Sequence, residues 1–82
     1  MNMDTGKVPQ KTLEDKLPEI FKYHSPQGDQ PQRYEAIRAK ALELAKVICE
    51  NTPLCADQAA AIRLLREAVM TANASIALQG LV

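Results

Sequence analysis

The sequence predicts an all-α fold in which a short N-terminal helix precedes an antiparallel hairpin of two long helices. Two long stretches of the chain repeat apolar residues with the 3.6-residue period of an α-helix. The tripeptide Asn-Thr-Pro at 51–53 is a stop signal between these stretches. The connection of about five residues favours an antiparallel arrangement of the two helices.

The length of the chain allows one domain and favours self-association. The 82 residues suit a single domain, to which we assign residues 11–82. A core of this size usually stabilises a fold by only a few kcal/mol unless disulfides, metals or further subunits contribute. We therefore expect the hairpin to assemble as a helical homo-oligomer.

The N-terminal part combines a polar segment, a short helix and a loop. Residues 1–10 are polar and include a glycine and a proline, so we predict a flexible tail. Residues 11–21 predict a short helix that Thr12 caps. Its apolar residues fall on one side of the helix: Leu13, Leu17, Ile20 and Phe21. Residues 23–32 are rich in proline, glycine and polar side chains, which predicts a loop.

Local signals predict the ends of the two long helices. The first helix runs from about Pro31 to Asn51, because proline suits a first helical turn. The second begins between Pro53 and Asp57, where Asp57 or a neighbouring residue is expected to cap it. It ends near Gln79, and a glycine follows directly.

Each long helix carries an arginine within a predicted apolar face. On a helical projection, Arg38 falls among the apolar residues Tyr34, Ile37, Ala41, Leu42, Leu44, Ala45, Ile48 and Cys49. Arg66 and Asn73 fall among Ala59, Ile62, Leu65, Val69, Met70, Ile76 and Ala77. A guanidinium on a packed face needs an anionic or polar acceptor, because arginine keeps its proton.

Two interpretations of these arginines stay open. Each arginine either forms a salt bridge within or between subunits or extends its charged head to the surface. The candidate carboxylates are Asp29, Glu35, Asp57 and Glu67. Alternatively, each arginine lines a pocket between subunits and binds a ligand phosphate in a fork geometry that lysine would not reproduce.

The second long helix also carries polar residues and many alanines. Asn73 can donate and accept hydrogen bonds, which suits a base or a ribose hydroxyl, but such a residue also sets helix register. Thr71 is more simply a residue on a helix face. The alanines let helices approach closely on more than one face, which predicts more than one partner helix. They are Ala59, Ala60, Ala61, Ala68, Ala72, Ala74 and Ala77.

Tyr23 and His24 come just before the predicted proline-containing loop, close to the apolar Phe21. An aromatic ring at this position can stack on a nucleobase, a contact that contributes about 1 to 3 kcal/mol in single-strand binders. Alternatively, Tyr23 fastens the short helix onto the hairpin and His24 satisfies a loop carbonyl. Both interpretations stay open for each residue.

Composition excludes several classes of function. Ten basic and ten acidic side chains give a formal net charge of zero, so no broad positive surface is available for DNA. Cys49, Cys55 and His24 do not have the spacing of a metal site, and we expect two reduced thiols and no metal.

We see no signal peptide and no membrane-spanning run, which predicts a cytoplasmic protein with no membrane partner. No paired carboxylates or activated nucleophile are visible, so we expect neither an enzyme nor a cofactor.

Three segments, in this order and spacing, carry a family resemblance. They are Phe-Lys-Tyr-His-Ser-Pro at 21–26 followed by Gln30, Arg-Tyr-Glu-Ala-Ile-Arg at 33–38, and Leu-Arg-Glu-Ala-Val-Met-Thr-Ala-Asn-Ala-Ser-Ile-Ala at 65–77. The chain resembles the small phage anti-CBASS sponges of the second anti-CBASS family, which capture cyclic nucleotide signals before these reach host effectors. The resemblance covers residues 21–77, and the first twenty residues match nothing.

The resemblance implies a homohexamer of helical hairpins with two kinds of ligand site. Cyclic dinucleotides such as 3′,3′-cGAMP bind between neighbouring subunits, and cyclic trinucleotides such as cyclic tri-AMP bind where three subunits meet. It further implies a phage protein that acts in the host cytoplasm and evades immunity by sequestering these messengers without degrading them.

Individual residues carry over from the resemblance. In the dinucleotide site, Tyr23 corresponds to the base-stacking tyrosine and Arg38 to the basic phosphate-binding position, while His24 and Pro26 shape the loop. In the trinucleotide site, Arg66 is expected to contact phosphate, with Thr71 and Asn73 nearby. The alternative function is an oligomerisation or adaptor module that docks on a host protein, for which an alanine-rich amphipathic helix is also suited.

Overall fold

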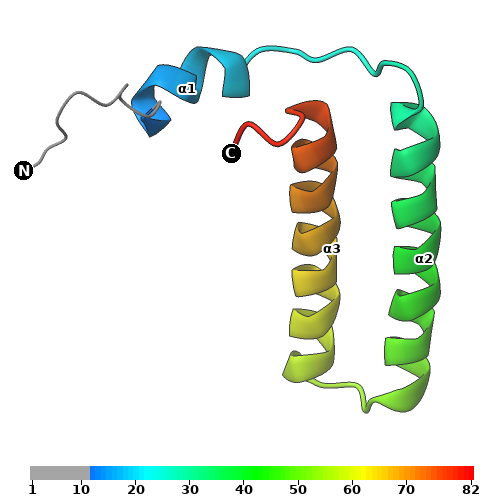
Figure 1. Ribbon diagram of the computed structural model, residues 1–82. Helices are drawn as coiled ribbons and strands as arrows, with labels where there is room; N and C mark the ends of the chain where they lie inside the picture. The colour runs from blue at the N-terminus through cyan, green and yellow to red at the C-terminus, as the bar shows by residue number, and fades with distance from the viewer. Residues whose placement is uncertain (1–11) are drawn as a thin grey trace, which may run out of the picture.

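The computed structural model describes residues 12–82, which form three α-helices and no strand. In chain order these are α1 (Leu13–Ile20), α2 (Gln30–Asn51) and α3 (Ala56–Ala77). Helices α2 and α3 lie side by side as an antiparallel hairpin, and α1 lies at the open end of that hairpin (Figure 1). This arrangement confirms the predicted all-α fold. The flexible tail predicted for residues 1–10 lies outside the described residues.

Helix α1 begins with the predicted cap. The Thr12 hydroxyl oxygen accepts a hydrogen bond from the Asp15 N–H at 3.3 Å, and the Asp15 carboxylate accepts one from the Thr12 N–H at 3.4 Å. These reciprocal bonds form a capping box, which satisfies two N–H groups that a helix start otherwise leaves free. Helix α1 packs on neither long helix, so its apolar residues Leu13 and Leu17 stay exposed.

Helix α2 begins one residue earlier than predicted, at Gln30, and Pro31 occupies its first turn as expected. Four residues, 52–55, connect it to α3. Gln58 closes this connection, because its side-chain amide donates to the Thr52 carbonyl at 3.2 Å and to the Thr52 hydroxyl oxygen at 3.1 Å.

Helix α3 begins at Ala56, within the predicted range of Pro53 to Asp57, but its cap and its end differ from the prediction. Cys55 precedes the helix and makes no side-chain capping bond. Asp57, one of the residues that we expected to cap the helix, lies inside the first turn, where its negative charge is stabilised by the positive end of the helix. The helix ends at Ala77, two residues before the expected Gln79, because Gln79 adopts a left-handed backbone with φ of 53°.

The packed seam of the hairpin is narrower than the predicted apolar faces. It consists of the half-buried residues Tyr34, Ile37, Ala41, Ala45 and Ile48 of α2 and Ile62, Leu65, Val69 and Ala72 of α3, together with the buried Ile76. Leu42, Leu44, Cys49, Ala59 and Met70, which the helical projections place on the apolar faces, lie beside the seam and are exposed in the single chain. A helix with a single neighbour covers only a narrow stripe, whereas these apolar arcs are wide enough for several neighbours.

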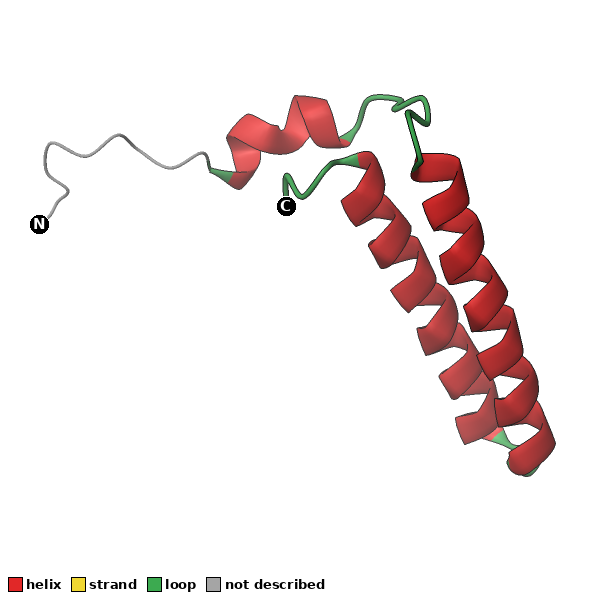
Figure 2. Cartoon of the chain, turned by 45° about the vertical axis from the view of Figure 1, so that its right-hand side comes forward, coloured by secondary structure: helices red, strands yellow, loops and turns green. Residues whose placement is uncertain are grey.

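The two long helices run together over their whole length, as the turned view shows (Figure 2). None of the helices in the part of the chain described has the length and apolar character needed to cross a membrane.

Candidate functional site

A polar cavity of about 390 Å³ lies at the open end of the hairpin. The end of α1, the loop that follows it and the residues at and after the end of α3 form its walls. Its lining comprises Glu19, Lys22, Tyr23, His24, Ser25, Gln27, Gln30, Ala77 and Gln79. An aromatic ring, an imidazole, carboxamides and the ion pair between Lys22 and Glu19, at 3.1 Å, thus surround one space. The ring can stack on a base, and the carboxamides can hydrogen-bond to a base edge.

Tyr23 is 83% exposed, and its side chain makes no hydrogen bond with residues 12–82. The interpretation that Tyr23 fastens α1 onto the hairpin is therefore wrong, because a fastening residue would be covered by both parts. The ring is instead available to a ligand in the cavity.

His24 is held in place by the end of α1. Its Nε2 lies 2.7 Å from the Glu19 carbonyl oxygen, and its Nδ1 lies 3.8 Å from the Glu19 carboxylate. A carbonyl oxygen only accepts hydrogen bonds, so Nε2 carries the proton and donates. His24 therefore satisfies a backbone carbonyl, as one of our interpretations held, although the carbonyl belongs to α1 and not to the loop. This bond orients the loop that carries Tyr23. Pro26 lies in the same loop and is exposed.

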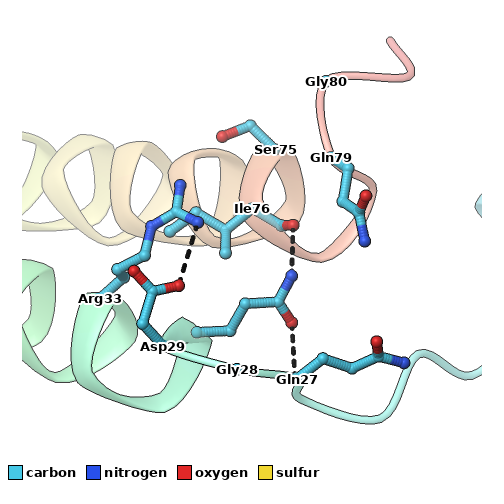
Figure 3. Close-up of a pocket in the computed structure, with 9 residues that line it drawn as sticks. Gln27, Gly28, Asp29, Arg33, Ser75, Ile76, Gln79 and Gly80 are labelled. Atoms are coloured by element: carbon cyan, nitrogen blue, oxygen red, sulfur yellow. Dashed lines mark hydrogen bonds and ion pairs between the residues drawn. The ribbon is translucent and has the colours of Figure 1, made fainter.

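Gln30 connects the loop to the end of the hairpin, a role that sequence reasoning missed. It is the one buried polar side chain of the described residues, with 7% of its surface exposed. Its Oε1 accepts a hydrogen bond from the Gln27 N–H at 3.0 Å, and its Nε2 donates one to the Ile76 carbonyl at 3.1 Å. Both bonds appear as dashed lines in Figure 3, ending at Gln27 and Ile76. The loop and α3 are thereby fixed relative to each other.

A second cavity of about 570 Å³ lies beside Gln30, and Arg33 and Asp29 are among the residues that line it. The Arg33 guanidinium lies 3.8 Å from the Asp29 carboxylate (Figure 3). Asp29 was a candidate partner for the arginines in the apolar faces, but it pairs with Arg33 one turn further along α2.

Arg38 lies outside the packed seam, contrary to the prediction. Its side chain is 58% exposed, and its guanidinium lies 3.0 Å from the Glu35 carboxylate, one of the candidates named from the sequence. An exposed ion pair of this kind contributes about 0 to 1 kcal/mol, so a ligand phosphate can displace the carboxylate at little cost. Arg38 is not among the residues that line the Tyr23 cavity. Tyr23 and Arg38, which the resemblance places in one dinucleotide site, are therefore not brought into one cavity within a single chain.

Arg66 lies at an apolar groove of about 240 Å³ on one flank of the hairpin. The groove is lined by Ala41, Leu42, Ala45, Ile62, Leu65, Arg66, Val69 and Met70. Arg66 makes no ion pair with a carboxylate of residues 12–82. In particular, the candidates Asp57 and Glu67 do not neutralise it, which leaves its guanidinium available to an anion from outside the chain.

Thr71 and Asn73, predicted to lie near Arg66, are not part of its groove. Thr71 is exposed, and Asn73 is half-buried. The Asn73 side-chain oxygen is buried and finds no donor among the described residues. A buried acceptor without a donor costs about 1 to 3 kcal/mol, so a donor from another chain or from a ligand would stabilise the protein at this position.

The opposite flank of the hairpin carries a second apolar groove, of about 490 Å³. It is lined by Ala36, Ile37, Lys40, Ala41, Leu44, Leu65, Ala68, Val69 and Ala72. Four of these nine residues are alanines, so another helix can approach closely on this flank.

The model of the Acb2/Tad1 hairpin domain matches residues 14–77, well over half of the chain. The chain belongs to this family. This match agrees with the resemblance to the anti-CBASS sponges that the sequence carries. The matched residues include the Tyr23 loop, α2 and α3. No curated protein and no solved structure matches the chain.

The described residues offer no cluster of metal ligands. No three side chains of His, Cys, Asp or Glu within 12–82 gather closely enough to hold a metal ion. Cys49 and Cys55 are both free and exposed.

Proposed function

We propose that this Acb2/Tad1 hairpin protein binds cyclic oligonucleotide signals of CBASS immunity and sequesters them intact. Cyclic dinucleotides such as 3′,3′-cGAMP and cyclic trinucleotides such as cyclic tri-AMP are the ligands. Membership of the family supports the anti-CBASS role. The observation that carries the proposal is the polar cavity in which the exposed Tyr23 ring lies beside Lys22 and several carboxamides.

A cyclic dinucleotide presents two phosphates and two bases, which need only a few well-placed groups. The Tyr23 ring stacks on one base, and arginine supplies a forked donor to a phosphate. Arg38 lies outside the Tyr23 cavity of its own chain, so the Arg38 of a neighbouring subunit completes the dinucleotide site. A homo-oligomer, which we propose to be a hexamer, is then required for binding.

The two apolar flanks of the hairpin support this assembly. A groove on each side of the seam gives each subunit two surfaces on which further helices can pack. Arg66 lies at one of these grooves, so in the oligomer it lies near a junction between subunits, where the proposed trinucleotide site forms.

The protein acts by mass action, without chemistry. When the concentration of binding sites exceeds both the dissociation constant and the concentration of the messenger, the free messenger stays below the concentration that activates an effector. We propose no catalytic residue, because none is needed for sequestration.

The test combines calorimetry with recovery of the ligand. Titration of 3′,3′-cGAMP and cyclic tri-AMP should release or absorb heat, and heat denaturation of the complex should then return each nucleotide with its original mass. Recovery of linearised nucleotide would show that the protein cleaves the ligand as a nuclease and does not sequester it intact. The adaptor function, which the same exposed apolar flanks favour, predicts no heat with any cyclic nucleotide.

A further inference from the structure

The backbone of Gln79 adopts a conformation that favours glycine. Gln79 has a φ of 53°, and among the described residues it is the only non-glycine residue with a positive φ. Its N–H donates to the Ile76 carbonyl at 3.1 Å, and the N–H of Gly80 donates to the Ser75 carbonyl at 3.0 Å. These two bonds form the Schellman motif that ends many helices, and glycine usually occupies the left-handed position of that motif. In this chain the glycine comes one residue later.

The strain at Gln79 is not offset by a structural role of its side chain. The Gln79 carboxamide makes no hydrogen bond with residues 12–82, and the residue is exposed. Strained backbone positions cluster at active sites and ligand-binding sites.

Gln79 borders two cavities, the Tyr23 cavity and the neighbouring cavity beside Arg33. Gln79 lines the same space as Tyr23, Lys22 and Gln27, on the wall that the end of α3 provides. Figure 3 shows its side chain extending away from α3 toward the side where the Gln27 loop runs. The buried Gln30 amide holds this wall in place through the Ile76 carbonyl, which also accepts the Gln79 N–H.

We infer that Gln79 is a ligand-binding residue whose carboxamide hydrogen-bonds to the edge of the adenine base that stacks on Tyr23. A carboxamide offers one donor and one acceptor side by side, and the N7 and exocyclic amine of adenine present the complementary pair. This inference rests on the proposed function, since it assigns a further residue to the proposed nucleotide cavity.

Two substitutions separate binding from folding. Gln79→Gly removes the carboxamide and relieves the strained backbone, so the free protein should melt at a higher temperature while its affinity for cyclic di-AMP falls roughly tenfold. Gln79→Glu keeps the size and the backbone but removes the donor, so the melting temperature should stay the same and the affinity should fall. Gln32→Ala is the matched control, because Gln32 is an exposed glutamine that does not line the Tyr23 cavity.

Calorimetry with cyclic di-AMP on the full chain measures the affinity of the wild-type protein and of each variant. Lower affinity in both variants, together with the higher melting temperature of Gln79→Gly, supports the assignment. Wild-type affinity in both variants would overturn the role of Gln79 and leave the proposed function intact. A lower melting temperature of Gln79→Gly would show that the side chain serves the fold, which also overturns it. If the wild-type protein gives no heat with any cyclic nucleotide, the proposed function itself fails.

Discussion

The buried side chain of Gln30 donates a hydrogen bond to the backbone carbonyl of Ile76, a residue 46 positions further along the chain, at 3.1 Å. The same carboxamide accepts a bond from the Gln27 N–H. One side chain therefore connects the loop after α1, the start of α2 and the end of α3. These are the segments that surround the Tyr23 cavity, so Gln30 determines how the cavity walls are placed.

Replacing Gln30 by leucine should destabilise the protein by about 1 to 3 kcal/mol, because the variant keeps the volume but loses both side-chain hydrogen bonds, each of which contributes about 0.5 to 1.5 kcal/mol. Chemical denaturation measures this change. The exposed Gln32→Ala variant should change the free energy of unfolding by no more than about 0.5 kcal/mol. Equal stability of Gln30→Leu and the wild-type protein would show that the bonds of Gln30 contribute nothing to the fold.

Tyr23→Ala should weaken ligand binding and leave the fold unchanged. The side chain is 83% exposed, so its loss should change the free energy of unfolding by less than about 0.5 kcal/mol. Loss of base stacking should cost about 1 to 3 kcal/mol of binding free energy. Calorimetry with 3′,3′-cGAMP measures the latter, and Tyr23→Phe, which keeps the ring, should bind like the wild-type protein. Full affinity in Tyr23→Ala would remove this residue from the site.

Glu35→Gln should strengthen the binding of cyclic dinucleotides, and Arg38→Ala should abolish it. The Glu35 carboxylate competes with a ligand phosphate for the Arg38 guanidinium, at a distance of 3.0 Å. Because the ion pair is exposed, either substitution should change stability by less than about 1 kcal/mol. Thermal shift with 3′,3′-cGAMP compares the variants. If Arg38→Ala keeps the ligand-induced rise in melting temperature, Arg38 does not bind the phosphate.

Arg66→Ala should lose cyclic tri-AMP binding and retain binding of 3′,3′-cGAMP. The two arginines occupy different surroundings, since Arg66 lies at an apolar groove and Arg38 in an exposed ion pair. Calorimetry of both ligands against both arginine variants tests this selectivity. Simultaneous loss of both ligands in Arg66→Ala would contradict two separate sites, provided that the oligomer remains intact.

Leu44→Glu should dissociate the oligomer. Leu44 is 48% exposed and lines the larger apolar groove, where a buried carboxylate between subunits would be costly. Leu64→Glu is the control, because Leu64 is exposed but belongs to neither groove. Sedimentation velocity should show smaller species for Leu44→Glu only. An unchanged sedimentation coefficient would mean that this groove is not a subunit interface.

Helix type, order and most ends were predictable from the sequence because they depend on local signals. Thr12 caps α1, Pro31 occupies the first turn of α2, and Asn51 ends that helix, each within a few residues of the signal. The end of α3 was less accurate, because Gln79 takes the left-handed position that the adjacent glycine would fill more easily.

The candidate site was only partly predictable, because its remaining features depend on the packing between helices. Periodicity shows how wide an apolar face is but not which part of it meets the partner helix, so Arg38 was assigned to the packed face although it is exposed. The role of Gln30 depends on the register between α2 and α3, which no local pattern contains. Tyr23 could be proposed from its type and its position before the loop.

Native mass spectrometry of the protein mixed with a pool of cyclic di- and trinucleotides tests the central claim most directly. We expect an oligomer that gains the masses of intact cyclic nucleotides and releases them unchanged on activation in the gas phase. A protein that retains its unliganded mass throughout the pool, or that carries only linear nucleotides, would contradict the account.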